Sequence, residues 1–270
     1  MRRLGQHWMV DTDAIRAMVN ALELCEGDVI VEIGPGKGAL TLPLVKRCQG
    51  LGCMVIAIEK DKNLIKILRN TIEINRSKVE LIEGDALKII PQVISHYKLS
   101  LEAARGRQTA SYKLVGNIPY YITGRLLRLI TESKKPPALA VLTIQRDVAE
   151  RLTATPPRMN LLAAAVQYAA QPEIIMHLTP GSFYPSPKVR SSIMKITDIR
   201  APDKEAAGAY YRFIKAAFAQ PRKQLAHCLA KMYGRENVLK TFSRLGMPPT
   251  VRAHELNLSQ LESLSRALGG

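Results

Sequence analysis

Residues Val29–Gly38 read VIVEIGPGKG, an apolar run that ends in a glycine turn. A run such as Val29–Val31 is typical of a strand buried on both faces of a parallel sheet. The segment after the glycines, Ala39–Arg47, has a helical pattern. Strand, glycine turn and helix in this order predict the first half of a nucleotide-binding α/β unit, with its ligand at the carboxyl end of the strand.

The glycines of this turn, Gly34, Gly36 and Gly38, allow tight backbone geometry and leave no Cβ between the chain and a ligand. Their spacing is GxGxG and not the GxGxxG expected for a dinucleotide pyrophosphate. An NAD-dependent dehydrogenase is therefore disfavoured, since the sequence also has no evident acid–base partner for hydride transfer. A glycine-rich turn without a ligand is the alternative that this motif leaves open.

Two acidic residues stand at the carboxyl ends of the next two predicted strands. The strand Met54–Glu59 ends in Glu59, about twenty residues beyond the glycines, where a carboxylate can accept hydrogen bonds from ribose hydroxyls. The strand Val79–Ile82 is followed by Asp85, which we expect to contact the adenine edge of a bound nucleoside. Either acid alone is more often a helix cap or a surface charge, but the pair after a glycine turn indicates a nucleoside site.

The rest of the pattern alternates strands and helices as far as residue 199. Further predicted strands are Tyr112–Val115, Ala138–Ile144, Ile174–Leu178 and Ser191–Ile196. The first predicted helix begins just after Asp11 or Asp13, either of which can cap it. Further predicted helices are Lys60–Ile74, Gly124–Glu132 with Thr123 as its cap, Arg146–Thr153 and Met159–Ala170. Residues 91–111 show little pattern, with a basic loop at Arg105–Thr109. The alternation predicts an α/β fold with a parallel, doubly wound sheet and helices on both faces.

From about Arg200 onward no strand pattern remains. Predicted helices cover Lys204–Ala219, Lys223–Tyr233, Glu236–Leu245 and Ser259–Leu268, and cations outnumber acids among them. The sequence therefore predicts an α/β domain over residues 1–199 and a small, basic, all-helical domain over residues 200–270.

The whole chain is strongly basic, with 39 Lys and Arg against 23 Asp and Glu and a formal net charge of +16. This excess points to a polyanionic partner, most simply nucleic acid, with a solvated basic surface as the alternative. No apolar stretch is long enough to span a bilayer and no signal peptide is evident, so we expect no membrane partner. The four cysteines (Cys25, Cys48, Cys53 and Cys228) have neither CxxC nor metal-site spacing, which predicts reduced core residues of an intracellular protein without a metal.

The segment Asn117-Ile118-Pro119-Tyr120 follows a predicted strand and adjoins the expected nucleoside site. It offers an amide oxygen, a carbonyl oxygen and an aromatic face, which suit a flat ring that carries an amine. Acceptors for the amine protons, at the Asn117 side chain and the Pro119 carbonyl, would favour a pyramidal, nucleophilic nitrogen, and Tyr120 could stack on the ring. The alternative is a proline turn that closes the strand, with Tyr120 in the core.

Six segments carry a resemblance over essentially the whole chain: GQHWMVD, VEIGPGKGALT, IEKD, EGDAL, GNIPYYIT and FYPSPKVRSSI. In this order and at these intervals, the sequence resembles the S-adenosylmethionine-dependent rRNA adenine N6,N6-dimethyltransferases of the KsgA type. The resemblance implies a Rossmann-like class I methyltransferase domain over residues 1–199 and an RNA-binding domain over residues 200–270. It also implies methyl transfer to the N6 amine of two adjacent adenines near the 3′ end of small-subunit rRNA, in ribosome biogenesis.

The same resemblance implies roles for the matching residues. The implied cofactor contacts are His7, Met9, Gly34, Gly36, Glu59, Asp85, Ala86 and Asn117, and the implied contacts of the target adenine are Asn117, Pro119, Tyr120 and Phe183. The implied partner is small-subunit rRNA or the pre-ribosomal small subunit, and we expect a cytoplasmic monomer.

The sequence departs from the family pattern at several positions. His7 stands where the family usually has Asn, and Arg190 stands where Asp is common. Pro221 and His227 interrupt a basic run, and residues 156–161 lack the family's Tyr-Gly pair. Two alternatives remain: an Erm-like enzyme that methylates an adenine of large-subunit rRNA, and a non-catalytic RNA-binding assembly factor. The presence of Glu59 and Asn117 argues against the second alternative.

Overall fold

The computed structural model describes residues 7–74, 79–97, 111–201 and 203–269. The basic loop predicted at Arg105–Thr109 lies outside the described residues. The chain divides into two compact units, one made of residues 1–149 and 171–201, the other of residues 150–170 and 202–270. Residues 150–170 thus join the helical unit, although the sequence-based division at residue 200 assigns them to the α/β domain.

Packing explains this difference in domain boundaries. Helix α7 (Leu161–Gln167) contributes to the same buried cluster as α8 (Lys204–Ala217). The Tyr210 hydroxyl on α8 donates a hydrogen bond to the Ala164 carbonyl at 3.3 Å, and the Tyr210 ring stacks on Tyr168 with centroids 4.1 Å apart. A helical pattern shows which face of a segment is apolar, but it does not show which core will receive that face.

A seven-stranded sheet forms the centre of the first unit, in the order β4-β3-β2-β5-β6-β9-β7. Its strands are β2 (Val29–Ile33), β3 (Met54–Glu59), β4 (Val79–Glu83), β5 (Tyr112–Asn117), β6 (Leu139–Gln145), β7 (Gln171–Leu178) and β9 (Ser191–Thr197). Strands β4, β3, β2, β5 and β6 pair in parallel, whereas β9 is antiparallel to both β6 and β7. The prediction of a parallel sheet is therefore wrong at β9. Residues 179–190 join β7 to β9 without a crossover helix, and adjacent strands joined in this way run antiparallel.

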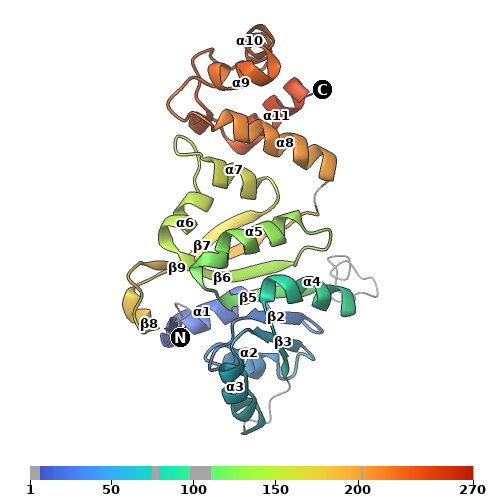
Figure 1. Ribbon diagram of the computed structural model, residues 1–270, viewed down its shortest axis with the longest axis vertical. Helices are drawn as coiled ribbons and strands as arrows, with labels where there is room; N and C mark the ends of the chain where they lie inside the picture. Colours follow the sequence, from blue (N-terminus) through green and yellow to red (C-terminus); the bar gives the residue numbers. More distant parts are fainter. Residues whose placement is uncertain (1–6, 75–78, 98–110, 202, 270) are drawn as a thin grey trace. The chain divides into compact units, whose positions relative to one another are not determined.

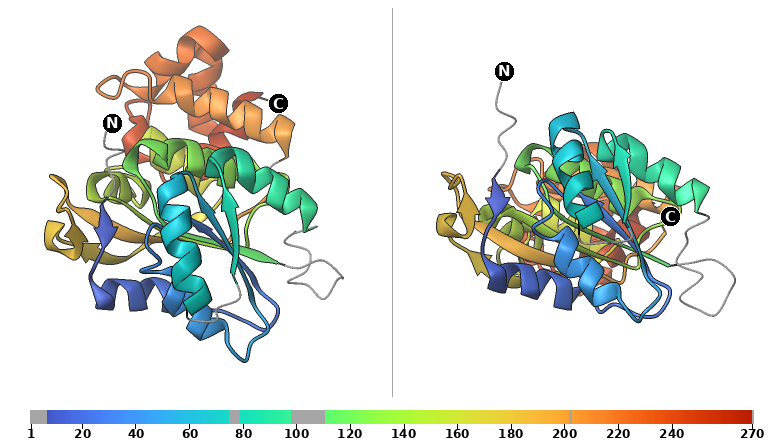
Figure 2. Two further views of the ribbon diagram at one scale, coloured as in Figure 1. Left: turned by 60° about the horizontal axis from the view of Figure 1, so that its bottom comes forward. Right: turned by 90° about the horizontal axis from the view of Figure 1, so that it is seen from below.

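Helices cover both faces of this sheet (Figure 1 and Figure 2). They are α1 (Thr12–Ala21), α2 (Thr41–Cys48), α3 (Lys62–Ile74), α4 (Ala86–His96), α5 (Thr123–Glu132) and α6 (Arg146–Leu152). The connections through α2 and α3 lead toward the β4 edge, whereas those through α4 and α5 lead in the opposite direction. Because crossovers are right-handed, α4 and α5 lie on the face opposite to α2 and α3. With both faces covered, β2 is buried at every position.

Two helix predictions differ from the structure. Helix α4 continues through Pro91 to His96, inside a stretch predicted to have little pattern. Pro91 is exposed, while Ile90 and Val93 are buried on the opposite side, so apolar burial outweighs the missing backbone donor. Thr123 is the first residue of α5 and not its cap, because the short helix η2 (Tyr120–Ile122) runs directly into α5.

The cysteines are all free thiols, but only Cys48 is buried; Cys25 is exposed, and Cys53 and Cys228 are half-buried. Core positions are therefore confirmed for one cysteine of the four. Within the described ranges, no cluster of three His, Cys, Asp or Glu side chains has the arrangement to hold a metal ion. None of the helices in these ranges has the length and apolarity needed to cross a membrane.

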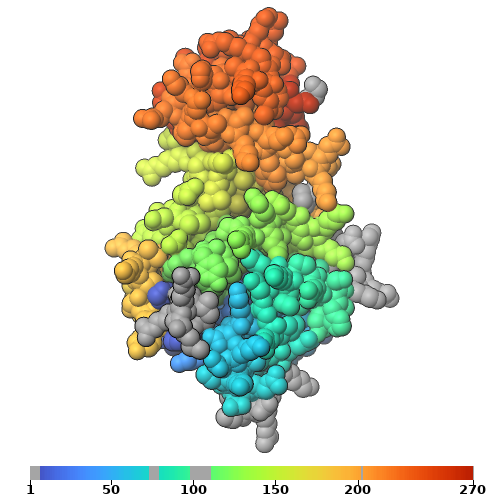
Figure 3. Space-filling model, in the orientation of Figure 1, coloured from blue at the N-terminus to red at the C-terminus, as the bar shows by residue number. Residues whose placement is uncertain are grey.

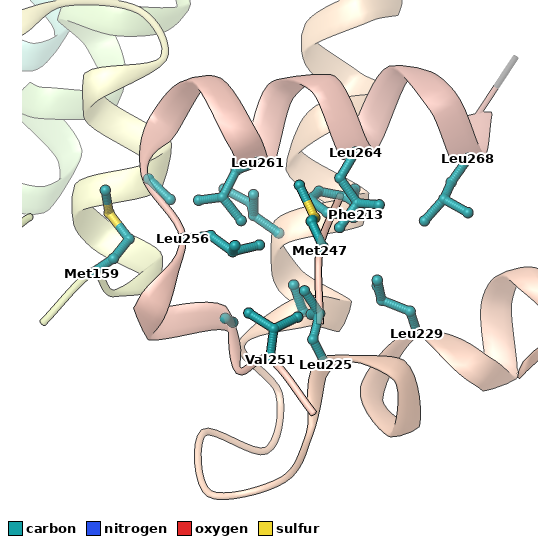
Figure 4. Close-up of a cluster of buried hydrophobic side chains, with 14 of the residues drawn as sticks. Met159, Phe213, Leu225, Leu229, Met247, Val251, Leu256, Leu261, Leu264 and Leu268 are labelled. Carbon is teal, nitrogen blue, oxygen red and sulfur yellow. The ribbon is translucent and has the colours of Figure 1, made fainter. Parts of the chain in front are cut away.

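The second unit is all-helical. Besides α7 and α8 it contains α9 (Leu225–Tyr233), α10 (Arg235–Arg244) and α11 (Leu258–Gly269), within a few residues of the predicted bounds. Figure 4 shows leucines of α11 facing a core of Phe213, Leu225 and Leu229, which are fully buried. This core belongs to the second unit alone, so it stabilises a separate helical body.

Candidate active site

Most of the predicted site residues converge at the carboxyl ends of the central strands. The first of two cavities there has about 550 Å³ of unfilled space and is lined by His7, Trp8, Gly34, Gly36, Glu59, Asn117, Ile118, Pro119 and Tyr120. Strand β2 leads into the glycine turn, β3 ends at Glu59, and β5 ends at Asn117. Adjacent parallel strands thus bring together side chains that are far apart in the sequence, at the place where α/β sheets bind ligands.

The glycine turn lies against the N-terminal segment. Gly34 and Gly36 have φ of +68° and +59°, in the left-handed region that favours glycine. A Cβ on Gly36 would lie 3.1 Å from Cδ1 of Trp8, so a side chain at this position would press on the tryptophan. The Lys37 ammonium lies 4.6 Å from the centroid of the Trp8 ring. The turn therefore needs glycine both for its backbone conformation and for its close contact with Trp8.

Glu59 is 5% exposed, and its carboxylate is held by main-chain donors. Its Oε2 accepts a hydrogen bond from the Gly36 N–H at 3.1 Å. Its Oε1 accepts from the N–H groups of Lys60 and Asp61, at 2.8 and 2.9 Å. A carboxylate has about four acceptor positions, so one remains for a ligand hydroxyl. Glu59 thus both shapes the glycine turn and presents an acceptor to the cavity.

A second cavity continues from the first and shares Gly34, Glu59 and Pro119 with it. Asp85 and Ala86 line this second cavity, at the start of α4. Asp85 caps α4 by accepting from the Leu87 N–H at 3.1 Å, and the Lys60 ammonium lies 3.5 Å from its other oxygen. The two predicted acids therefore occupy successive parts of one extended site.

Tyr121 also lines the second cavity, and its side chain is mostly exposed there. The sequence interpretation passed over this residue in favour of its neighbour Tyr120. The available signal was the doubled tyrosine directly after the proline turn, because consecutive residues in a turn point in different directions. The turn consequently presents one ring to each of the two cavities.

Asn117 and Tyr120 are each held by one hydrogen bond. The Asn117 side-chain Nδ2 donates to the His7 carbonyl oxygen at 2.7 Å, which orients the amide. The Tyr120 hydroxyl and the Ser191 hydroxyl lie 2.6 Å apart. The Pro119 carbonyl accepts from the Ile122 N–H at 3.1 Å, which leaves one lone pair of that carbonyl for a ligand. The polar groups predicted to hold an amine are therefore present, oriented and partly engaged.

His7 connects the N-terminal segment to the loop that follows β8 (Phe183–Tyr184). Its Nδ1–H donates to the Pro185 carbonyl at 2.6 Å. Its ring lies 24° from parallel to that of Tyr120, with centroids 6.5 Å apart. The residues after His7 form β1 (Trp8–Met9), which pairs with β8. This segment therefore closes one wall of the first cavity.

Two predicted site residues lie elsewhere. Met9 and Phe183 are partners in the β1–β8 register, and they are 5% and 2% exposed, respectively, within the core of the first unit. In the structure they support the wall of the first cavity and do not line it. Phe183, which the resemblance implies as a contact of the target adenine, points into the core of this structure, while its neighbour Tyr184 points outward.

A further acid, Glu32, lies in β2 two residues before the glycine turn, and only 1% of it is exposed. Burial raises the pKa of its carboxyl to about 8. Its Oε2 has no hydrogen-bond partner among the described residues. The sequence analysis does not single out Glu32, although a lone acid inside an apolar strand indicates a buried carboxyl.

Comparisons with known proteins agree over nearly the full chain. Residues 1–267 match the family model for ribosomal RNA adenine dimethylase. The chain is 34% identical to the ribosomal RNA small subunit methyltransferase A of Pelotomaculum thermopropionicum, over 98% of this chain and 90% of the relative. It is also 34% identical to the protein of the same name from Moorella thermoacetica, over 98% and 91%.

Two solved structures share the fold. The 23S rRNA methyltransferase ErmE has a TM-score of 0.74 at 22% identity, covering 97% of this chain and all of that chain. A dimethyladenosine transferase from Plasmodium falciparum has a TM-score of 0.76 at 21% identity, covering 96% of both chains. At these identities the likeness concerns the fold, and it confirms the predicted methyltransferase architecture with a helical C-terminal part.

Proposed function

Since the chain belongs to the ribosomal RNA adenine dimethylase family, we propose that it transfers methyl groups from S-adenosylmethionine to the N6 amine of adenine in small-subunit ribosomal RNA. The observation that carries this assignment is the meeting of Glu59, Asn117 and Tyr120 in one cavity, within a chain that matches the family over residues 1–267. We propose two methyl additions per adenine, as the family description implies.

The residues of the two cavities fit this cofactor. S-adenosylmethionine supplies, when bound, a methyl group attached to a positively charged sulfur. The glycine turn has no Cβ at Gly34 or Gly36 and can approach the ligand closely. The remaining acceptor of Glu59 suits a ribose hydroxyl, and Asp85 and Ala86 in the second cavity suit the adenine. We assign the cofactor to these residues, with its reacting end toward Asn117.

The target amine is assigned to the side of Asn117, Pro119 and Tyr120. Because Asn117 Nδ2 is engaged by the His7 carbonyl, the amide oxygen is its free end and can accept one N–H of the amine. The second lone pair of the Pro119 carbonyl can accept the other N–H. Tyr120 offers a stacking face for the base, which must leave its own stack to reach the cavity.

This arrangement promotes methyl transfer mainly by alignment. The N6–C bond forms as the S–C bond breaks, and the new ammonium then releases one proton to water. No proton leaves before the attack, so a strong general base is unnecessary. The two acceptors strengthen their hydrogen bonds as the nitrogen gains positive charge, which stabilises the transition state more than the ground state.

We assign RNA binding to the helical second unit, whose exposed cations include Arg222, Lys223 and Lys231. Phosphate contacts of this kind hold and orient an RNA without specifying its sequence. We also propose that the enzyme acts as a cytoplasmic monomer on the small ribosomal subunit or its precursor.

The experiment is methyl transfer from tritiated S-adenosylmethionine to undermethylated small subunits, with large subunits assayed in parallel. The label should appear as N6,N6-dimethyladenine in small-subunit rRNA when the nucleotides are mapped by mass spectrometry. Label confined to large-subunit rRNA would favour an Erm-like activity. Normal RNA binding without any label would favour a non-catalytic assembly factor.

A further inference from the structure

A groove runs between helices α4 and α5, outside both cavities of the proposed active site. The two helices lie next to each other in Figure 1 and Figure 3, and the groove has about 1360 Å³ of unfilled space. It shares no lining residue with the second cavity, although consecutive residues of α4 line the two: Ala86 lines that cavity, and Leu87 lines the groove.

The floor of the groove is apolar. On α4 it is lined by Leu87, Pro91 and Ile94, which are spaced four and three residues apart and so share one helix face. Leu129 lines it from α5. Ile94 is buried, whereas Pro91 is exposed and Leu87 and Leu129 are half-buried, so part of this apolar surface remains open to a ligand.

The rim of the groove is basic. Four cations line it, namely Arg125, Arg128, Lys134 and Lys135, and all are exposed. The acidic residue in the lining is Glu132, which forms an ion pair with Arg128 at 3.3 Å. Three cations of the lining thus have no matching carboxylate within it, and the groove carries a local positive charge.

We infer that this groove binds a single-stranded segment of the substrate RNA. The rim cations would contact phosphates, and the apolar floor would contact the faces of unpaired bases or riboses. An unpaired strand fits better than a duplex, because a duplex presents its charged backbone outward and would leave the apolar floor uncovered. The inference rests on the proposed function, because that function makes an RNA the polyanionic substrate that a basic groove on this unit would contact.

An apolar groove could also bind an amphipathic peptide, and the charge of the rim distinguishes this occupant from RNA. A peptide would need an acidic flank to match the basic rim, whereas every nucleotide of an RNA carries a phosphate. The structure thus favours RNA, and the experiment below includes the peptide as an outcome.

The test is a triple variant, Arg125→Gln/Lys134→Gln/Lys135→Gln, measured for binding to deproteinised small-subunit rRNA over a range of salt concentrations. Arg128 is left intact because its ion pair with Glu132 belongs to α5 itself. The matched control is Lys46→Gln/Arg47→Gln/Lys66→Gln, which removes three exposed cations from α2 and α3 on the opposite face. Both variants lose the same net charge, so any difference between them reports the location of the charge.

We expect the groove variant to bind the RNA at least tenfold more weakly than the control, with a slope of log affinity against log salt that is shallower by about 2. A second variant, Leu129→Ala, should weaken binding severalfold and leave that slope unchanged, because it removes an apolar side chain and no charge. S-adenosylmethionine affinity, measured by calorimetry, should stay the same in all three proteins.

Two results would overturn the inference. One is a groove variant whose RNA affinity and salt slope match those of the control. The other is normal binding of deproteinised RNA with weak binding of intact small subunits, which would assign the groove to a ribosomal protein. Neither result would affect the proposed activity. Conversely, if the groove variant weakens RNA binding as expected but the wild-type protein transfers no methyl group, the proposed activity is wrong and the groove inference stands.

Discussion

At the scale of single residues, Asn117 holds the central position of the site. Its amide is fixed by the His7 carbonyl, so the N-terminal segment determines which end of the amide faces the cavity. The same segment reaches Pro185 through the His7 imidazole. The orientation of the Asn117 amide therefore depends on a segment more than a hundred residues away in sequence.

Replacing this amide should affect turnover and not binding. We expect Asn117→Ala to lower kcat by about two to three orders of magnitude, the scale for the loss of one hydrogen bond that strengthens in the transition state. RNA affinity should change little, because phosphate contacts lie elsewhere. The measurement is single-turnover methylation of small subunits, with filter binding in parallel. The control is Asn20→Ala on the exposed side of α1, and an Asn117→Ala protein as fast as this control would contradict the mechanism.

The buried carboxyl of Glu32 predicts an unusual dependence of stability on pH. Burial raises its pKa from 4.5 to about 8 in the folded protein. Between these pH values the folded state keeps a proton that the unfolded chain has released, so stability falls as the pH rises through this window. Glu32→Gln keeps the shape and removes the titration.

The free energy of unfolding of Glu32→Gln, minus that of wild type, should therefore rise by at least about 1 kcal/mol from pH 5 to pH 8. Urea unfolding at the two pH values measures this difference. Glu26→Gln, which changes an exposed carboxylate, serves as the control and should follow the wild-type profile. A Glu32→Gln profile that parallels wild type would show that Glu32 titrates normally.

At the scale of elements, a buried ion pair holds together the ends of β2 and β5 that are remote from the active site. The Lys113 ammonium lies 2.7 Å from Asp28 and donates to the Glu23 carbonyl at 2.6 Å. Asp28 also accepts from the Cys25 N–H at 2.7 Å. Lys113 and Asp28 are 7% and 5% exposed, so neither charge can turn to water when the other is removed.

Lys113→Met should therefore destabilise the first unit by about 3–5 kcal/mol, since it leaves the Asp28 carboxylate buried without its cation. The double variant Lys113→Met/Asp28→Asn should recover a large part of that loss. Urea unfolding measures both proteins, and methyl transfer per folded molecule should stay near wild type because the pair lies at the opposite end of the strands. A loss below about 1 kcal/mol for Lys113→Met would mean that Asp28 is compensated by its other partners.

At the scale of the whole molecule, the interleaved division of the chain affects how RNA binding can be tested. Truncation at residue 200 would remove the helices that cover α7, and the remaining fragment would expose apolar surface. Point variants in the intact protein avoid this problem. The exposed cations Arg222, Lys223 and Lys231 of the second unit are suitable positions.

We expect Arg222→Gln/Lys223→Gln/Lys231→Gln to flatten the salt dependence of RNA binding, by about 0.7 to 0.9 in slope for each phosphate that these cations neutralise in the wild type. Methylation of small subunits should fall at subsaturating RNA, whereas S-adenosylmethionine affinity should not change. The control is the same α2/α3 triple variant used for the groove. An unchanged slope would show that the cations of the second unit are solvated surface.

Local sequence patterns were enough to predict the strands of the α/β sheet, the glycine turn, the acids Glu59 and Asp85 and the segment from Asn117 to Tyr120. These features depend on local patterns: apolar runs, glycine spacing and residues that directly follow a strand. The helices of the second unit were also predicted closely, because amphipathic periodicity is a local property.

The features that depend on which surfaces meet could be seen only in the folded structure. It assigned α7 to the helical unit, turned β9 antiparallel and put Met9 and Phe183 in the core. It also joined His7 to Asn117 and brought α4 beside α5 to form the groove. Each of these features rests on contacts between segments distant in sequence, and an apolar or polar pattern along one segment cannot specify its partner.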